Sequence, residues 1–267
     1  MTSHNEIQNQ LKKAFLRNEF KVHYQAQFDI KSNKVAGFEA LIRWQKKEGL
    51  LSPESFLKDV ENSGLMPLVG MNVLNLVFQD IAHQKLQRLG ITKVAINLSY
   101  QEISNERFVQ HLLSLIQHFQ IDPTLLTLEL TESDKVQDLT SLNETIQRLR
   151  ETGISFALDD FCTGCSCLSH LRALDIDYIK IDRSFITHIA ESKKDYLIVQ
   201  NLIAVTKALG IKSIIEGVEN HQQLQLIRSM NADWVQGYLF SKPQAIEHYL
   251  STATPASSAI NASAQAL

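Results

Sequence analysis

Five carboxylates stand where the sequence reads as the ends of buried strands, and acids placed in this way are typical of a site for divalent cations. They interrupt or follow the short apolar runs in "GFEALIRW", "LTLEL", "FALDD" and "SIIEG", as Glu39, Glu129, Asp159, Asp160 and Glu216. If folding brought these acids together, they would repel one another unless cations neutralised them. Oxygen ligands favour Mg²⁺ or Mn²⁺, and the Asn97 amide of "VAIN" would fit the same ions. Zinc is less favoured because no histidine stands at these strand ends.

The chemistry that these residue types favour is phosphodiester hydrolysis with two metal ions, in which a shared aspartate bridges the ions. Arg43 lies in the same run as Glu39, whereas Lys180 and Gln236 interrupt other apolar runs, and all three could hold phosphate or base groups. A rival interpretation makes Lys180 the Schiff-base lysine of an aldolase, but it leaves the acids without a purpose. Any one of these polar residues could be a solvated loop residue or a satisfied polar group of the core. Polar residues at nearly every strand end are better explained by one site.

Short apolar runs of strand length alternate along the chain with amphipathic segments of helix length. The expected strands are "KVAINLS", "LLTLELT", "ISFALDD", "DYIKID", "KSIIEGV" and "DWVQGYLF". The expected helices are "NERFVQHLLSLIQHF", "DLTSLNETIQRLRETG", "KKDYLIVQNLIAVTKALG" and "NHQQLQLIRSM", and Gly153 and Gly210 stand where a C-terminal cap belongs. This order predicts an α/β fold of the TIM type, a (β/α)8 barrel, whose strand ends would meet at one mouth. An open doubly wound sheet is the alternative, although no glycine-rich phosphate loop follows an early strand.

The composition is that of a globular protein, with 267 residues, 44% hydrophobic and 21% charged. A net charge of -3 and the lack of a polybasic run give no reason to expect a nucleic-acid polymer or anionic lipid as a partner. We expect no signal peptide and no membrane segment, because the most apolar stretch, "PLVGMNVLNLVFQDIA", is short and interrupted. Three clustered cysteines favour a reducing, cytoplasmic setting. We expect one domain over residues 1–250 and a low-complexity tail, disordered or a linker remnant, over 251–267.

Eight motifs, in order from about Leu11 to Leu250, resemble the EAL-domain cyclic di-GMP phosphodiesterase family. They are "GFEALIRW", "SPESFLKDVENSGL", "INLS", "LELTE", "DDFCTG", "YIKIDRSFI", "IIEGVE" and "QGYLFSKP". The resemblance implies the EAL variant of the TIM barrel, a cytoplasmic location, a homodimer, and cleavage of cyclic di-GMP to linear pGpG. An alternative within the family is a catalytically weak or inactive domain that acts as a cyclic di-GMP receptor or as a protein-interaction module.

The resemblance also implies a role for each matching residue. One ion would be held by Glu39, Asn97, Glu129 and Asp159, and the second by Asp159, Asp160 and Glu216. Lys180 would contact the attacking water, with Glu216 or an aspartate such as Asp160 as the candidate base. Nucleotide contacts fall to Gln25, Arg43 and Gln236. Glu132 would anchor the loop after the paired aspartates; Glu219 matches a family site glutamate whose role is less defined, and both could instead be purely structural.

The loop after the paired aspartates departs from the family pattern DDFGTGYSSL. Cys162 replaces its glycine, Cys165 its tyrosine and Cys167 a serine. Loss of the glycine matters if the backbone there needs a positive φ. The three thiols and His170 could form a redox or zinc switch, or the thiols could be small apolar residues in a tolerant loop.

Overall fold

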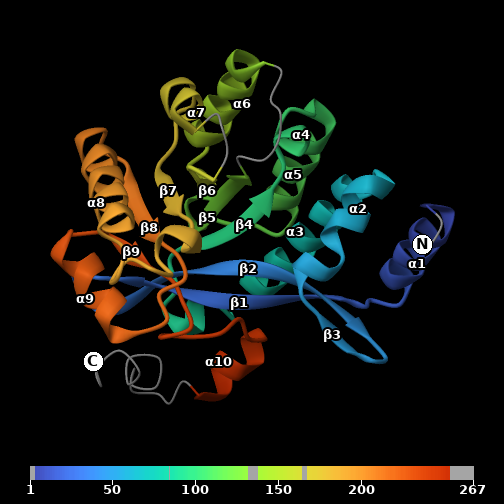
Figure 1. Ribbon diagram of the computed structural model, residues 1–267. Coiled ribbons are helices and arrows are strands. Elements are labelled where there is room, and N and C mark those ends of the chain that lie inside the picture. The colour runs from blue at the N-terminus through green and yellow to red at the C-terminus, as the bar shows by residue number, and fades with distance from the viewer. Residues whose placement is uncertain (1–3, 84, 132–137, 164–166, 253–267) are drawn as a thin grey trace.

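Eight strands close into a barrel in the computed structural model of the protein, which describes residues 4–83, 85–131, 138–163 and 167–252 (Figure 1). In ring order the strands are β1 (Phe20–Asp29), β9 (Trp234–Val235), β8 (Lys212–Ile215), β7 (Tyr178–Ile181), β6 (Ser155–Phe161), β5 (Leu126–Thr131), β4 (Val94–Leu98) and β2 (Lys34–Lys46). Pairing of β1 with both β9 and β2 closes the ring, and the short β3 (Gly49–Leu51) extends the free end of β2. The predicted barrel is confirmed.

One strand of the barrel differs from a regular (β/α)8 arrangement. Seven strands follow one another in parallel around the ring, in the order β2, β4, β5, β6, β7, β8 and β9. The eighth, β1, is antiparallel to both β2 and β9. The cause lies in the connection, because a four-residue turn joins β1 to β2 and leaves no room for a crossover helix. Asn33 supplies the left-handed residue of this turn, with φ 52°, and the Ser32 amide donates to Asp29 Oδ1 at 2.7 Å.

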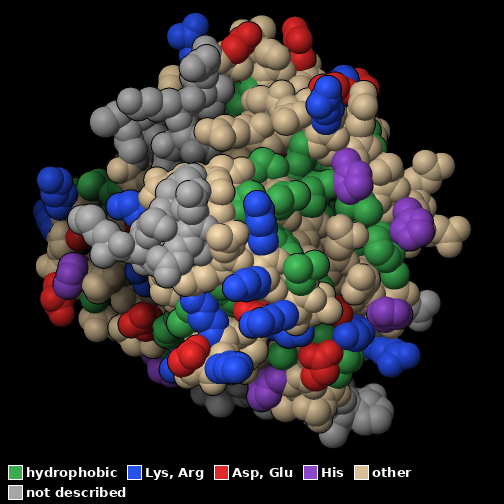
Figure 2. Space-filling model, turned by 90° about the vertical axis from the view of Figure 1, so that its right-hand side faces the viewer, with side chains coloured by type: hydrophobic (Ala, Val, Ile, Leu, Met, Phe, Trp, Pro, Cys, Tyr) green, Lys and Arg blue, Asp and Glu red, His purple; other side chains and the backbone are tan. Residues whose placement is uncertain are grey.

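Helices cover the outside of the barrel. They are α1 (His4–Leu16), α2 (Leu57–Ser63), α3 (Met66–Ala82), α4 (Tyr100–Ile103), α5 (Glu106–His118), α6 (Leu139–Glu151), α7 (Cys167–Ala173), α8 (Lys193–Ala208), α9 (His221–Ser229) and α10 (Ile246–Thr252). The four helices expected from periodicity appear as α5, α6, α8 and α9, and Gly153 and Gly210 follow two of them with φ of 105° and 72°. None of the helices in the described ranges is both long and apolar enough to span a membrane. On the face that carries α1 and α2, Lys and Arg side chains are interspersed with Asp and Glu (Figure 2).

The apolar stretch that stands out in the sequence is α3, which packs against β1 beneath the barrel wall. Val73 and Val77 of this helix are buried in the main core, and Tyr24 Oη of β1 donates to Asp80 Oδ2 at 2.8 Å. Its polar residues Asn72, Asn75 and Gln79 line a small cavity shared with α1 and the start of β1. The stretch is therefore a core helix.

The inside of the barrel is divided along its length. Its lower part is a separate apolar cluster, which we call the barrel floor: Ala157, Tyr178, Ile214 and Trp234. The Tyr178 and Trp234 rings lie 5.1 Å apart. Because side chains alternate across a strand, the residue two positions after each floor residue faces the same interior. Those residues are Asp159, Lys180, Glu216 and Gln236, so the polar site lies directly above the floor.

Candidate functional site

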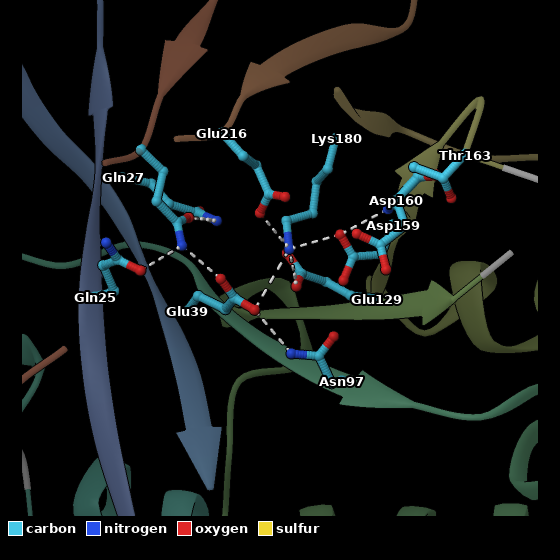
Figure 3. Close-up of polar contacts among 11 residues, drawn as sticks. Gln25, Gln27, Glu39, Asn97, Glu129, Asp159, Asp160, Thr163, Lys180 and Glu216 are labelled. Carbon is cyan, nitrogen blue, oxygen red and sulfur yellow. Dashed lines mark hydrogen bonds and ion pairs between the residues drawn. The ribbon is translucent and has the colours of Figure 1, made fainter. Parts of the chain in front are cut away.

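A single buried ammonium group lies at the centre of the site, surrounded by carboxylates from four other strands or strand ends (Figure 3). Lys180 on β7 is 1% exposed. Its Nζ lies 2.8 Å from Glu129 Oε2, 2.9 Å from Asp159 Oδ1, 2.9 Å from Glu216 Oε1 and 3.4 Å from Glu39 Oε1. The barrel therefore brings together the acids that the sequence placed at separate strand ends.

Two groups of three carboxylates have ligand oxygens within 4.8 Å of one another, and they share one residue. The first group is Glu39, Glu129 and Asp159; the second is Asp159, Asp160 and Glu216. This division matches the two ion sites expected from the family resemblance. Asn97, the remaining expected ligand, lies beside the first group, where its Nδ2 donates to Glu39 Oε1 at 2.8 Å.

The first group contains an oxygen whose bonding capacity is unused within the described ranges. Glu129 is completely buried, and its Oε1 has no hydrogen-bond partner there. Burial raises the pKa of Glu129 well above its usual range, despite the nearby Lys180. Glu39 is nearly as buried, but Lys180 and the amides of Gln236 and Asn97 outweigh burial and hold its pKa below the usual value. An oxygen-rich site with a buried, unpartnered acceptor fits a hard divalent cation.

The other acids of the site also have shifted pKa values. Burial and the adjacent Asp159 raise the pKa of Asp160 to about 6. Burial raises the pKa of Glu216 to about 8, although Lys180 acts in the opposite direction. Burial would lower the pKa of Lys180, but the surrounding carboxylates outweigh it and raise this pKa well above its usual range. The ammonium group thus pairs with four of the five carboxyl groups of the site, and added positive charge would relieve the repulsion that remains.

The expected nucleotide contacts lie along one wall of an open cavity of about 810 Å³ above the acids. Gln25 and Gln236 are buried, and Gln236 Nε2 donates to Gln25 Oε1 at 3.0 Å. Arg43 lines the cavity half-buried, with its guanidinium bonded to the Ile42 carbonyl at 2.8 Å. Exposed Glu219 also lines the cavity, and its backbone amide donates to Gln223 Oε1 at 2.8 Å. Glu132 lies outside the described residues.

Sequence reasoning did not assign every residue of the site. Arg183 and the exposed Tyr238 line the same cavity. They lie within the motifs "YIKIDRSFI" and "QGYLFSKP", three positions after Lys180 and two after Gln236. Gln27 is 2% exposed and donates from Nε2 to Gln236 Oε1 at 3.1 Å. A signal for Gln27 was present, because it stands two positions after Gln25 and so shares its face of the strand.

The loop after β6 is held in a backbone conformation that few side chains adopt. Asp160 has φ 50° and Cys162 has φ 68°, both in the left-handed region. Loss of the family's glycine matters if the backbone needs a positive φ at this position. Cys162 does have a positive φ, so the replacement is expected to strain the backbone. The Thr163 backbone amide and hydroxyl both donate to the Asp160 carbonyl, at 3.1 and 2.8 Å. These bonds help to hold a turn that begins at a candidate metal ligand.

Replacement of Cys162 by glycine is expected to raise the free energy of unfolding by up to about 1 kcal/mol. Relief of the left-handed strain is worth about 1–2 kcal/mol, and the greater freedom of glycine in the unfolded chain offsets about half of it. Urea denaturation in metal-free buffer measures the change. Cys162→Ala is the matched control, because it removes the thiol and keeps the Cβ; stabilisation by alanine equal to that by glycine would contradict the explanation.

The suggested cysteine switch cannot be placed. Cys165 lies outside the described residues, and the side chain of Cys167 is not described either. The Cys162 side chain is partly buried and packs against the core. His170 is 4% exposed and its Nδ1 lies 3.5 Å from Tyr100 Oη. The redox or zinc switch remains a prediction.

Comparison with known proteins links this site to one family. The EAL domain family model matches residues 8–243. Over 249 residues the chain is 33% identical to the cyclic di-GMP phosphodiesterase NbdA of Pseudomonas aeruginosa, which covers 92% of this chain and 32% of NbdA. The chain spans about a third of the length of the curated relatives that it matches in this way.

Two solved structures are similar in fold and sequence. The EAL enzyme Bd1971, in its cAMP- and cyclic-di-GMP-bound form, superposes with a TM-score of 0.86 at 30% identity, covering 93% of this chain and 68% of that chain. The PaMucR phosphodiesterase in complex with c-di-GMP has a TM-score of 0.82 at 29% identity, covering 91% of this chain and 99% of that chain.

Proposed function

From the premise that this chain belongs to the EAL domain family, we propose that it hydrolyses cyclic di-GMP to linear pGpG with two bound divalent cations, Mg²⁺ or Mn²⁺. The observation that carries the proposal is the pair of carboxylate groups that share Asp159. A shared ligand brings two cations close together, as two-metal phosphodiester cleavage requires. The buried, unpartnered Glu129 Oε1 supports the same assignment. Relatives and neighbours named for cyclic di-GMP supply the substrate class.

Each group of residues has a part in the proposed reaction. Glu39, Asn97, Glu129 and Asp159 would hold the first ion, and Asp159, Asp160 and Glu216 the second. When bound, the two ions supply Lewis acidity, which activates water for attack on phosphorus and neutralises charge on the leaving oxygen.

The remaining residues orient the reactants. The Lys180 ammonium lies at the centre of the carboxylates, where it can donate a hydrogen bond to the attacking water. Glu216, or Asp160, is the candidate base that takes the water's proton. Gln25, Arg43 and Gln236 line one side of the cavity and would hold the nucleotide. The low exposure of the site keeps these electrostatic interactions strong.

The proposed reaction is expected to need Mg²⁺ or Mn²⁺ and to stop in excess chelator, because the acids repel an anionic substrate when no cation is bound. Incubation with cyclic di-GMP followed by chromatography for pGpG measures it. Calcium should inhibit, since its longer and looser coordination misplaces the water. Full turnover in chelator would overturn the mechanism. Binding of cyclic di-GMP without any hydrolysis, in every cation tried, would instead identify a receptor.

The family resemblance adds a homodimer and a cytoplasmic location to the proposal. It also adds a loop-anchoring role for Glu132 and a site role for Glu219, which lines the cavity. Light scattering of the purified protein tests the homodimer. A monomer at all concentrations would remove the dimer from the proposal.

A further inference from the structure

A chain of buried amides connects the antiparallel strand β1 to the acids of the site. Gln27 donates from Nε2 to Gln236 Oε1 at 3.1 Å. Gln236 in turn donates from Nε2 to Gln25 Oε1 at 3.0 Å and to Glu39 Oε2 at 2.5 Å. Each of these four side chains is at most 7% exposed. Figure 3 shows the chain running from the Gln27 side of the site to Glu39, one of the acids nearest to Lys180.

Gln27 lies opposite a glycine of the neighbouring strand. Gln27 is paired in register with Gly37 of β2, just as Gln25 is paired with Glu39. A Cβ at position 37 would lie 3.4 Å from Gln27 Oε1 and 2.9 Å from the Lys93 carbonyl oxygen. The tight approach at Gly37 is therefore to the Lys93 carbonyl, while Gln27 lies at an ordinary contact distance and reaches Gln236.

The orientation of the Gln236 amide decides what faces Glu39. Its Nε2 donates to two acceptors, Gln25 Oε1 and Glu39 Oε2. If the amide turned over, its oxygen would face a carboxylate and a carbonyl oxygen and would bond to neither. On the other side, the Gln27 Nε2 donor matches the Gln236 oxygen in the observed orientation only. A buried polar network of this kind fixes one geometry when every member is satisfied.

We infer that Gln27 is a positioning residue of this site: it fixes the amide orientation of Gln236 and, through Gln236, the carboxylate of Glu39. The inference rests on the proposed function, in which Glu39 holds a cation. With Oε2 held by Gln236, the other oxygen of Glu39 faces Lys180 Nζ at 3.4 Å and accepts from Asn97. Groups that orient metal ligands in this way typically change metal affinity or activity by about 10- to 100-fold when they are removed.

The test compares Mn²⁺ binding to the purified, metal-free chain by isothermal titration calorimetry. Gln27→Met keeps the length of the side chain and removes the donor, and is expected to weaken Mn²⁺ binding by about tenfold. It should also lower kcat for cyclic di-GMP, and any change in KM would arise indirectly through Gln236, because Gln27 itself is assigned no nucleotide contact. Ser213→Ala is the matched control. It removes a buried side chain whose hydrogen bond to Asp233 lies at the opposite end of the barrel, and should leave both values within twofold.

A double-mutant cycle separates this role from a general loss of stability. If Gln27 acts through Gln236, then Gln27→Met should have little further effect on Mn²⁺ affinity in a Gln236→Met background. Circular dichroism checks that each variant is folded. Should Gln27→Met fail to fold, Gln27→Asn carries the same expectation, because its amide stays polar but is one methylene too short to reach Gln236.

The outcomes distinguish the inference from the function beneath it. No Mn²⁺ binding by the unaltered chain would remove the proposed function and the inference with it. Mn²⁺ binding by the unaltered chain, with unchanged affinity in the Gln27 variants or with additive effects in the cycle, would overturn the inference alone. If Gln27→Met weakens Mn²⁺ binding in the unaltered protein but has no further effect in the Gln236→Met background, both the proposed function and the inference are supported.

Discussion

Replacement of Asp159 by asparagine is expected to lower turnover of cyclic di-GMP by on the order of 10³-fold or more, because this residue belongs to both carboxylate groups. Asparagine keeps the shape of the side chain but loses the charge that two cations would share. Chromatographic assay of pGpG at saturating Mn²⁺ measures the loss. Asp175→Asn makes the same chemical change before β7, at the far end of the barrel, where Asn143 and Gln147 donate to the carboxylate. This control should keep normal turnover.

The number of bound Mn²⁺ ions tests whether Asp159 belongs to both ion sites. Calorimetry is expected to find two Mn²⁺ ions per chain in the unaltered protein and one in Asp160→Asn, since Asp160 belongs to only one group. Asp159→Asn should weaken both ions. If Asp159→Asn and Asp160→Asn lose the same single ion, Asp159 does not bridge.

Replacement of Lys180 by methionine is expected to affect both stability and catalysis. In metal-free buffer the four carboxylates within 3.4 Å of Nζ would lose the buried ammonium that pairs with them, at a cost of about 3–5 kcal/mol in the free energy of unfolding. Added Mn²⁺ should recover much of this loss, because it supplies positive charge to the same oxygens. At saturating Mn²⁺, kcat should still be lower by about 100-fold or more, with a smaller change in KM. Urea denaturation and steady-state kinetics measure the two effects.

Lys85→Met is the control for this variant. Lys85 also bridges two acids, Asp80 at 2.8 Å and Glu247 at 3.0 Å, but its side chain is 28% exposed, so its loss should cost only about 0–1 kcal/mol. Near-normal turnover in Lys180→Met would show that its assigned role at the water is wrong. Reductive trapping of a carbonyl substrate on Lys180 by borohydride would revive the aldolase alternative.

The site could be predicted because its residues obey the period of a strand. In an apolar run, an acid or lysine at a strand end is conspicuous, and a parallel barrel collects all such ends at one mouth. Glu129 and Lys180 were found in this way, and the structure places their charged atoms 2.8 Å apart. The left-handed conformation at Cys162 could also be anticipated, because the family has a glycine there.

The first strand could not be recognised on the same basis. The segment "HYQAQFD" has glutamines at its interior positions, so β1 carries neither the apolar run nor the acidic end that identified the other strands. The antiparallel direction of β1 follows from the four-residue turn after Asp29. This turn was not recognised in the sequence as the loop of a hairpin. Gln27 was missed with it. The contacts of Gln27 depend on β1 lying beside β9, which joins residues about 200 positions apart.

The barrel floor limits the routes by which ions, water and nucleotide can reach the site. Tyr178 and Trp234 pack in the interior below the acids, and the cavity that the described residues form at the site lies above them. Ions, water and nucleotide would then all enter through the cavity above the acids. A nucleotide bound in this cavity would cover ions already bound by the acids. If the proposed reaction is correct, ions load before the nucleotide and are held beneath it until the product departs. In the proposed reaction the apolar floor would therefore set the order in which ions and nucleotide exchange.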